Sequence, residues 1–165
     1  MPGKGVSKEV CDIEAIIEDA LRMQEVSLKK AGVEVSRRFQ NIPRCSVHES
    51  QLSQVLINLI KNASEAMSGN DNQNKRRVLT IEAGDAGDGF LFIVVRDTGC
   101  GICEENLVRI FNHGFSTKPD GHGFGLHTSA LALTNMGGRL KADSGGEGQG
   151  AVFTLLLLIA EGVPV

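Results

Sequence analysis

Two glycine clusters follow an apolar segment in the middle of the chain, and they constrain the fold more than any other feature. The apolar run at 90–95 has the composition of a strand interior. Asp-Thr-Gly-Cys-Gly-Ile follows at 97–102, and Gly-His-Gly-Phe-Gly-Leu at 121–126 precedes apolar residues at helical spacing. Glycines let backbone approach a ligand closely, and N–H groups at a helix start favour an anion. We therefore expect a carboxylate at a strand end and an anion-binding turn at a helix start, at two ends of one site.

Length and composition favour one domain spanning 1–165, with its core at about 10–160. The 165 residues are 41% hydrophobic and 22% charged, which is ordinary for a globular protein with a real core. The net charge of −3 and the lack of Trp and Tyr argue against nucleic acid as a partner. The apolar run at 151–160 is too short to cross a bilayer. We expect a cytoplasmic domain without membrane contact, and the parent protein could still be membrane-anchored.

Four cysteines bring metal and redox chemistry into consideration. Cys100 and Cys103 form a C-x-x-C motif, but a zinc site would need a second pair, and Cys11 and Cys45 are isolated in the sequence. A thioredoxin-like pair would be expected to open a helix after the first strand of its unit. Here the pair lies among glycines that have their own explanation, so we favour reduced thiols without such a role.

Hydrophobic periodicity predicts a mixture of helices and strands. Strands are expected at 6–10, 33–39, 44–47, 78–83, 90–96, 139–143 and 151–159. Helices are expected at 13–31 after an Asp12 N-cap, at 49–67 and at about 122–136. Because the order is not a strict βαβ alternation, we expect an α/β fold, a two-layer sandwich with a mixed, mainly antiparallel sheet packed against helices. Residues 102–122 carry few core signals and predict a long lid.

The predicted helix at 49–67 carries three polar residues on one side. Asn58, Asn62 and Glu65 lie within about 60° of each other around the helix axis. Asn62 falls at the margin of the apolar stripe, where an amide oxygen could complete the ligand shell of a Mg²⁺ ion. The alternative is the solvated polar face that any amphipathic helix has.

Four motifs in a fixed order resemble the ATP-binding catalytic domain of two-component sensor histidine kinases. They are Asn-x-x-x-Asn-Ala at 58–63, Asp-x-Gly-x-Gly-Ile at 97–102, Phe-x-x-x-Phe-x-Thr-Lys at 111–118 and Gly-x-Gly-x-Gly-Leu at 121–126. That domain belongs to the GHKL superfamily, which also holds gyrase and MutL, and the resemblance covers about residues 10–160. It implies an α/β sandwich with ATP held between the helices and the lid. A Walker A motif is absent from the sequence, and the glycine run lacks the context of a dinucleotide-binding fold.

The resemblance also implies roles for individual residues. Asn62 would be the Mg²⁺ ligand and Asn58 its partner, and both would be catalytic together with Lys118, which would neutralise the terminal phosphate. Asp97 would accept the adenine amino group. The remaining ATP-binding residues would be Gly99, Gly101, Ile102, Phe115, Thr117, Gly121, Gly123, Gly125 and Leu126. Phe111 would also belong to the lid motif, and Gly148 and Gly150 would form the last glycine turn.

The residue type at position 58 distinguishes kinases from hydrolases within this superfamily, and this chain has Asn58. ATP-hydrolysing members carry Glu at this position to activate water, and an amide cannot accept that proton. A neutral histidine acceptor already has a nucleophilic lone pair. We therefore expect transfer of the γ-phosphoryl group to a histidine, with a non-catalytic ATP-sensing module or an anti-sigma-type serine kinase as alternatives.

The resemblance places the acceptor histidine on a separate helical hairpin. His48 lies at the start of the 49–67 helix and is not expected to be that acceptor, and His127 is expected to be structural. The implied partners are the acceptor-histidine dimerisation domain of the parent protein and, downstream, a response regulator receiver domain. Because dimerisation is a property of the hairpin, this chain alone is expected to be a monomer.

Overall fold

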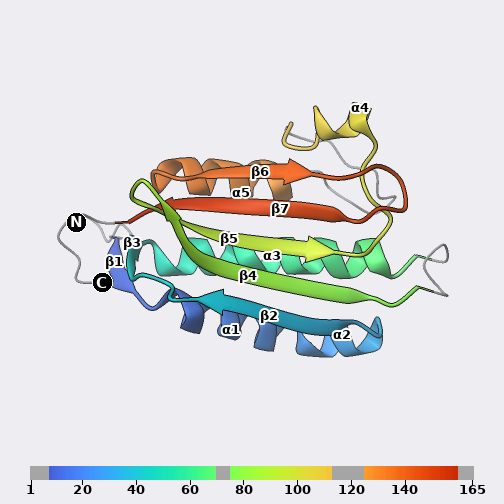
Figure 1. Ribbon diagram of the computed structural model, residues 1–165, viewed down its shortest axis with the longest axis horizontal. Coiled ribbons are helices and arrows are strands. Elements are labelled where there is room, and N and C mark those ends of the chain that lie inside the picture. Colours follow the sequence, from blue (N-terminus) through green and yellow to red (C-terminus); the bar gives the residue numbers. More distant parts are fainter. Residues whose placement is uncertain (1–7, 70–74, 113–124, 160–165) are drawn as a thin grey trace.

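A five-stranded sheet forms one layer of the molecule (Figure 1). The computed structural model describes residues 8–69, 75–112 and 125–159. In spatial order the strands are β2 (Glu34–Gln40), β4 (Val78–Gly87), β5 (Phe90–Asp97), β7 (Ala151–Leu158) and β6 (Arg139–Asp143). β2 runs parallel to β4, and the other neighbours are antiparallel. The prediction of a mixed, mainly antiparallel sheet is confirmed.

The helices form the second layer, against one face of the sheet (Figure 1). They are α1 (Ile13–Met23), α2 (Glu25–Lys30), α3 (Glu49–Met67) and α5 (Gly125–Asn135). Alternate strand residues point toward them and are buried: Leu79, Ile81, Ala83, Leu91, Ile93, Val95, Phe153, Leu155 and Leu157. α3 supplies the opposing apolar surface with Leu52, Leu56, Leu59 and Ile60. Truncating one such leucine to alanine would cost about 2–5 kcal/mol.

The single helix expected at 13–31 is broken in two at Gln24, so that prediction is wrong. Asp12 does cap α1 as expected, by accepting from the backbone N–H of Ala15 at 3.3 Å. Gln24 leaves the helical conformation at φ −103° and ψ 7°. After Leu21 the apolar stripe resumes only at Leu28, so no buried side chain holds the intervening turn against the core.

β1 (Glu9–Cys11) and β3 (Cys45–Val47) form a separate two-stranded antiparallel sheet. β1 overlaps the end of the strand predicted at 6–10 and continues to Cys11. Residues 6 and 7 of that prediction fall outside the described chain. β3 lies next to the C-terminal end of β7, because the Cys45 thiol donates to the carbonyl oxygen of Leu158 at 3.0 Å. The small sheet therefore covers one end of the sandwich.

The β4–β5 hairpin has a shorter turn than residues 84–89, which lie between the two strands predicted at 78–83 and 90–96. β4 continues to Gly87 through an irregularity between Asp85 and Gly87, and two residues join the strands. Those residues are Asp88 at φ 56° and Gly89 at φ 84°, and two-residue hairpin turns with positive φ match the right-handed twist of the strands. The glycine-rich composition signalled the turn but not its length.

The segment between β5 and α5 begins with the short helix α4 (Glu104–Leu107), beyond the sheet edge formed by β6 (Figure 1). Only residues 102–112 of the predicted lid at 102–122 are described, and α5 is described from Gly125. Across the described residues, no helix combines the length and apolar character needed to cross a membrane.

Candidate functional site

Asp97 is a buried carboxylate at the last residue of β5. It is 6% exposed, and the backbone N–H of Gly99 donates to its Oδ1 at 2.8 Å. Burial raises the pKa of Asp97 to about 6, and hydrogen bonds from the backbone of Gly99 and Ala151 oppose that rise. The carboxylate is thus an acceptor held by backbone dipoles in a poorly solvated place, which suits recognition of a neutral ligand that donates.

The loop after Asp97 packs directly on the C-terminal end of α3. A Cβ atom on Gly99 would lie 2.6 Å from the backbone carbon and oxygen of Ala66, so only glycine fits there. The N–H of Cys100 donates to the same Ala66 carbonyl at 3.0 Å. Gly101 has φ 75°, and its Cβ would collide with the carbonyl of Gly146. The two glycines predicted to shape this turn are therefore required by contacts on opposite sides of it.

The glycine-rich turn between β6 and β7 forms the other wall of this loop. The N–H of Gly148 donates to the carbonyl of Cys100 at 2.6 Å, and the N–H of Gly150 donates to that of Gly99 at 3.1 Å. Ser144 joins the two segments, because its Oγ accepts from the N–H of Ile102 at 3.0 Å and donates to the carbonyl of Gly150 at 2.6 Å. Sequence reasoning missed Ser144, whose only signal is a hydroxyl beside a glycine run.

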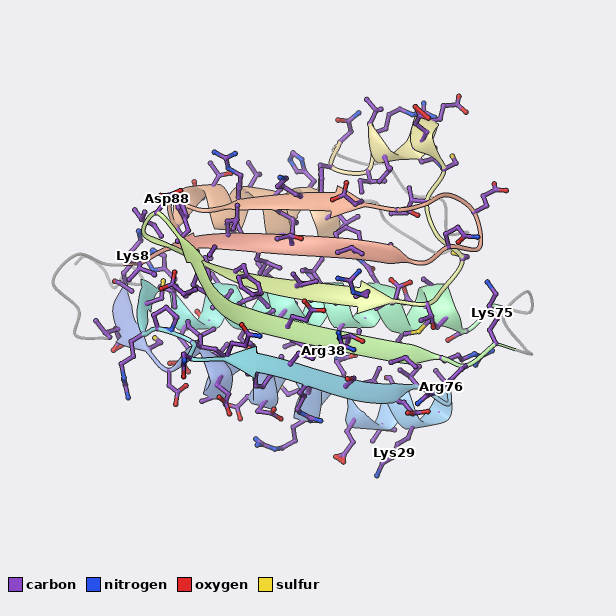
Figure 2. All side chains as sticks on the ribbon, in the orientation of Figure 1. Lys8, Lys29, Arg38, Lys75, Arg76 and Asp88 are labelled. Atoms are coloured by element: carbon purple, nitrogen blue, oxygen red, sulfur yellow. The ribbon has the colours of Figure 1, made fainter. Side chains whose placement is uncertain are left out.

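Lys75 was also missed as a residue that shapes the site. Its Nζ donates to the carbonyl of Gly148 at 2.6 Å, and Figure 2 shows it at the end of the sheet where β5 ends. The composition of the triplet 75–77 predicts a solvated strand entry, and the structure agrees, because Lys75 and Arg76 are exposed just before β4. Arg76 also forms an ion pair with Glu34, and Arg77 donates to the Ala31 carbonyl at 2.6 Å. These pairings join residues far apart in the chain, so no local pattern reveals them.

Thr98 anchors the same loop to the start of β4. Its Oγ1 accepts from the N–H of Val78 at 3.1 Å and donates to the carbonyl of Arg76 at 3.0 Å. The side chain also lies 3.5 Å from the sulfur of Met67. The loop is therefore held from α3, from the 144–150 turn and from the entry of β4, which fixes the direction of the Asp97 carboxylate.

α3 links this loop to α5 through Asn58. The Asn58 side-chain amide donates to the Oγ of Ser129 at 3.4 Å, and its oxygen accepts from Nε2 of Gln54 at 3.1 Å. Ser129 is 1% exposed and lies one helical turn after Gly125. Asn62 is half-buried, as its place at the margin of the stripe predicted, and Glu65 is exposed.

The two contacts of α3 define the dimensions of the site. Ala66 touches the Asp97 loop and Asn58 touches α5, and eight residues of helix separate them by about 12 Å. Asn62 lies midway between them along the helix. α3 thus links the loop after Asp97 at its C-terminal end to α5 at Asn58, which are segments far apart in the sequence. Among the described residues, no atom lies within 4 Å of a Cβ added at Gly125.

The described part of the predicted lid is tied to α5. Ile102, Phe111 and Leu126 are half-buried against the core, and the carbonyl of Phe111 lies 3.0 Å from Nδ1 of His127. This contact agrees with the expected structural role of His127. The remaining predicted site residues lie outside the described chain, so their roles stay predictions: Phe115, Thr117, Lys118, Gly121 and Gly123. His113 and His122 lie there too.

The chain matches a known family over most of its length. Residues 47–161 match the histidine kinase-, DNA gyrase B- and HSP90-like ATPases. The protein therefore belongs to this ATPase family, which confirms the resemblance found in the sequence.

Curated relatives within the family are sensor histidine kinases and sensor proteins. Sensor histidine kinase ZraS of Salmonella typhi is 34% identical over 142 residues, which cover 86% of this chain and 28% of ZraS. Sensor protein FixL of Bradyrhizobium diazoefficiens is 32% identical over 157 residues, which cover 93% of this chain and 30% of FixL. The chain thus spans less than a third of the length of these relatives.

Solved structures show the same architecture. The nucleotide-free catalytic domain of histidine kinase ThkA superimposes with a TM-score of 0.80 at 24% identity, covering 92% of this chain and 95% of that one. Full-length ShkA in complex with AMPPNP superimposes with a TM-score of 0.83 at 25% identity, covering 98% of this chain and 33% of ShkA. The fold is that of histidine kinase catalytic domains.

Proposed function

We propose that this chain binds Mg–ATP and transfers the γ-phosphoryl group to a histidine on a separate helical-hairpin domain, within a sensor histidine kinase. The observation that carries the proposal is the pairing of Asn58 with Ser129 beside the half-buried Asn62. By the resemblance, Asn58 occupies the position where hydrolysing members of the family carry their general base, and an amide cannot act as one. The family match and the sensor kinase relatives support the same assignment.

Asp97 is proposed to select adenine. Its buried carboxylate accepts hydrogen bonds and donates none when ionised, so it suits the exocyclic amino group of adenine. Guanine presents a carbonyl at the corresponding position, and two facing acceptors would leave both unsatisfied. Gly99 and Gly101, whose added Cβ atoms would collide with backbone, keep the loop close-packed beside the carboxylate.

Asn62 is proposed to hold Mg²⁺ through its amide oxygen. The residue suits this ion because Mg²⁺ takes oxygen ligands and retains water and phosphate oxygens around it. When bound, the ion would neutralise phosphate charge during transfer. Lys118 is proposed to contribute a further positive charge, with Phe115, Thr117, Gly121 and Gly123 in the lid and Gly125 and Leu126 at the start of α5.

The transfer itself requires little covalent chemistry from the chain. A neutral imidazole nitrogen of the acceptor attacks the γ-phosphorus, the bond to the β–γ bridging oxygen breaks, and ADP leaves with that electron pair. The other imidazole nitrogen then loses its proton to solvent. Asp97 would hold the adenine ring, and Asn62 and Lys118 would orient the phosphates. The reaction depends on this positioning.

The experiment supplies a histidine-bearing helical-hairpin domain in trans with ATP labelled on the γ-phosphate. We expect acid-labile label on that domain and negligible free phosphate. Asn62→Ala should abolish both nucleotide binding and labelling. Asn135→Ala, which removes an exposed amide at the end of α5, is the matched control and should label normally.

Other outcomes identify the alternatives. Acid-stable label on serine would indicate a serine kinase, and multiple turnovers of free phosphate would indicate a hydrolase. Tight ATP binding without labelling of any acceptor would indicate an ATP-sensing module. Each of these results would overturn the proposal.

The wider context is proposed from the same assignment. The receiver domain of a response regulator would take the phosphoryl group from the hairpin histidine, in the cytoplasm. The chain 1–165 would behave as one domain and as a monomer, because dimerisation resides in the hairpin. Light scattering after size-exclusion chromatography tests this, and a stable dimer of the chain alone would contradict it.

A further inference from the structure

Two cysteines that are far apart in the sequence face each other in the small sheet. In the pairing of β1 with β3, Cys11 lies directly opposite Cys45. Directly opposed residues of antiparallel strands have Cα atoms about 4.5 or 5.5 Å apart, depending on the kind of pair. Both separations lie within the range that a disulfide spans, and opposed side chains project from the same face. The backbone therefore already has a geometry that accepts a bridge.

The two thiols differ in access. Cys45 is fully buried and donates to the carbonyl of Leu158 at 3.0 Å. Cys11 is 7% exposed and lines a surface hollow of about 220 Å³ whose lining also includes Glu9, Asp12, Asp19 and Glu49, of which Asp19 is paired with Arg22 at 2.7 Å. A small reagent would reach Cys11 first, and it would meet negative charge on the way.

We propose that Cys11 and Cys45 are a thiol–disulfide site that closes by exchange with small, positively charged disulfides. The Cys11 thiolate attacks one sulfur of the reagent, forms a mixed disulfide and releases the first reagent thiol. The Cys45 thiolate then attacks the Cys11 sulfur, and the second reagent thiol leaves as the Cys11–Cys45 bond forms. The protein loses two electrons and two protons, and the reagent disulfide is reduced to two thiols.

The surroundings make this site slow and selective. Burial, followed by the charges of Glu49 and Glu9, raises the pKa of Cys11, and burial raises the pKa of Cys45 to about 11. Arg44 beside Cys11 and Lys8 beside Cys45 act in the opposite direction but do not outweigh burial. Because only the thiolate attacks a disulfide, the raised pKa values slow the oxidation of both cysteines. The acidic hollow favours a cationic reagent over an anionic one.

The bridge would lie at the end of the sandwich away from Asp97. Cys45 contacts Leu158, which pairs with Phe90 at the first residue of β5, whereas Asp97 is the last residue of that strand. Figure 1 shows β1 and β3 at one end of the sheet and the β5 terminus at the other. Closure is therefore expected to stabilise the fold and leave nucleotide affinity unchanged.

The test uses the chain with Cys100→Ser and Cys103→Ser, so that Cys11 and Cys45 are its only cysteines. Folded protein is treated with cystamine, a cationic disulfide, or with oxidised glutathione, an anionic one. We expect a mass loss of two hydrogen atoms, a peptide pair linked through the two cysteines, and faster closure with cystamine by an amount that shrinks in high salt. The melting temperature should rise by roughly 5–12 °C, because the bridge closes a loop of more than thirty residues.

Adding Cys45→Ser to that background provides the matched control, which should stop at a mixed disulfide on Cys11. Three results would overturn the proposal in the parent background: thiols that stay unmodified in the folded protein, a mixed disulfide that never closes, or a lower melting temperature after closure. Faster closure with oxidised glutathione would overturn access through the acidic hollow. These readouts do not involve nucleotide, so they stand apart from the test of the proposed kinase function.

Discussion

Replacing Asp97 by asparagine should stabilise the empty protein while removing its affinity for ATP. The side chain is 6% exposed, and burial raises its pKa from the ordinary 3.8 to about 6. Keeping this carboxyl ionised in the folded chain therefore costs about 3 kcal/mol relative to the unfolded chain. Asparagine keeps an oxygen that can accept from the N–H of Gly99 at nearly the same size, and it avoids the cost of ionisation.

The sign of the effect depends on pH. Because the folded pKa is raised, the folded chain binds more protons than the unfolded chain between about pH 4 and pH 6, and stability falls as pH rises through this window. Near pH 8 the parent protein bears the full cost of ionising Asp97, and asparagine removes that cost. Because the neutral amide oxygen accepts hydrogen bonds less strongly than the carboxylate does, part of this stabilisation is lost. The expected net stabilisation by Asp97→Asn is about 1–2 kcal/mol near pH 8, and it should shrink by about 2 kcal/mol near pH 4.5.

Urea unfolding of both proteins at the two pH values measures this difference. The matched control Asp143→Asn removes an exposed carboxylate at the end of β6, and it should change the free energy of unfolding by less than about 0.5 kcal/mol at either pH. Titration with a fluorescent ATP analogue should show that only Asp97→Asn loses binding. An Asp97→Asn protein that is less stable than the parent near pH 8 would refute the assignment of Asp97 as a destabilising, ligand-directed carboxylate.

Three further outcomes follow from the described contacts. Gly99→Ala should cost about 1–3 kcal/mol of stability in thermal or urea unfolding, because its Cβ would collide with the backbone of α3. Gly125→Ala should cost nothing, because its Cβ would meet no atom of the described residues within 4 Å. Ser129→Ala should lower the free energy of unfolding by about 1 kcal/mol and reduce phosphotransfer more than ATP binding, since the hydroxyl positions Asn58. Affinity for ATP should fall as pH drops below about 6, where Asp97 becomes protonated, and isothermal titration at several pH values checks that direction.

Much of the site could be predicted because its signals are local. The carboxylate at the end of an apolar strand and the flanking glycines occupy consecutive positions, and Asp97, Gly99 and Gly101 do lie in one close-packed loop. The position of Asn62 at the edge of the buried stripe likewise follows from helical spacing alone. Roles in chemistry came from the order of motifs rather than from any single pattern.

The features that sequence reasoning missed depend on contacts between distant segments. Lys75 reaches Gly148, and Ser144 reaches Ile102, and neither pairing has a periodicity or a motif. The break at Gln24 escaped notice because the flanking residues are good helix formers, and only the missing core contact ends the helix there. Facing cysteines in β1 and β3 were hidden for the same reason, since strand register is a property of the folded sheet.

The strand order has a consequence for how the protein is made. β7 lies between β5 and β6, although it is the last described strand to leave the ribosome. Until it inserts, β6 has no neighbour in the sheet, and the turn at 144–150 cannot close over the Asp97 loop. Nucleotide therefore cannot assist the folding of this domain until the β6–β7 hairpin has formed, and only from then on can ligand binding stabilise it.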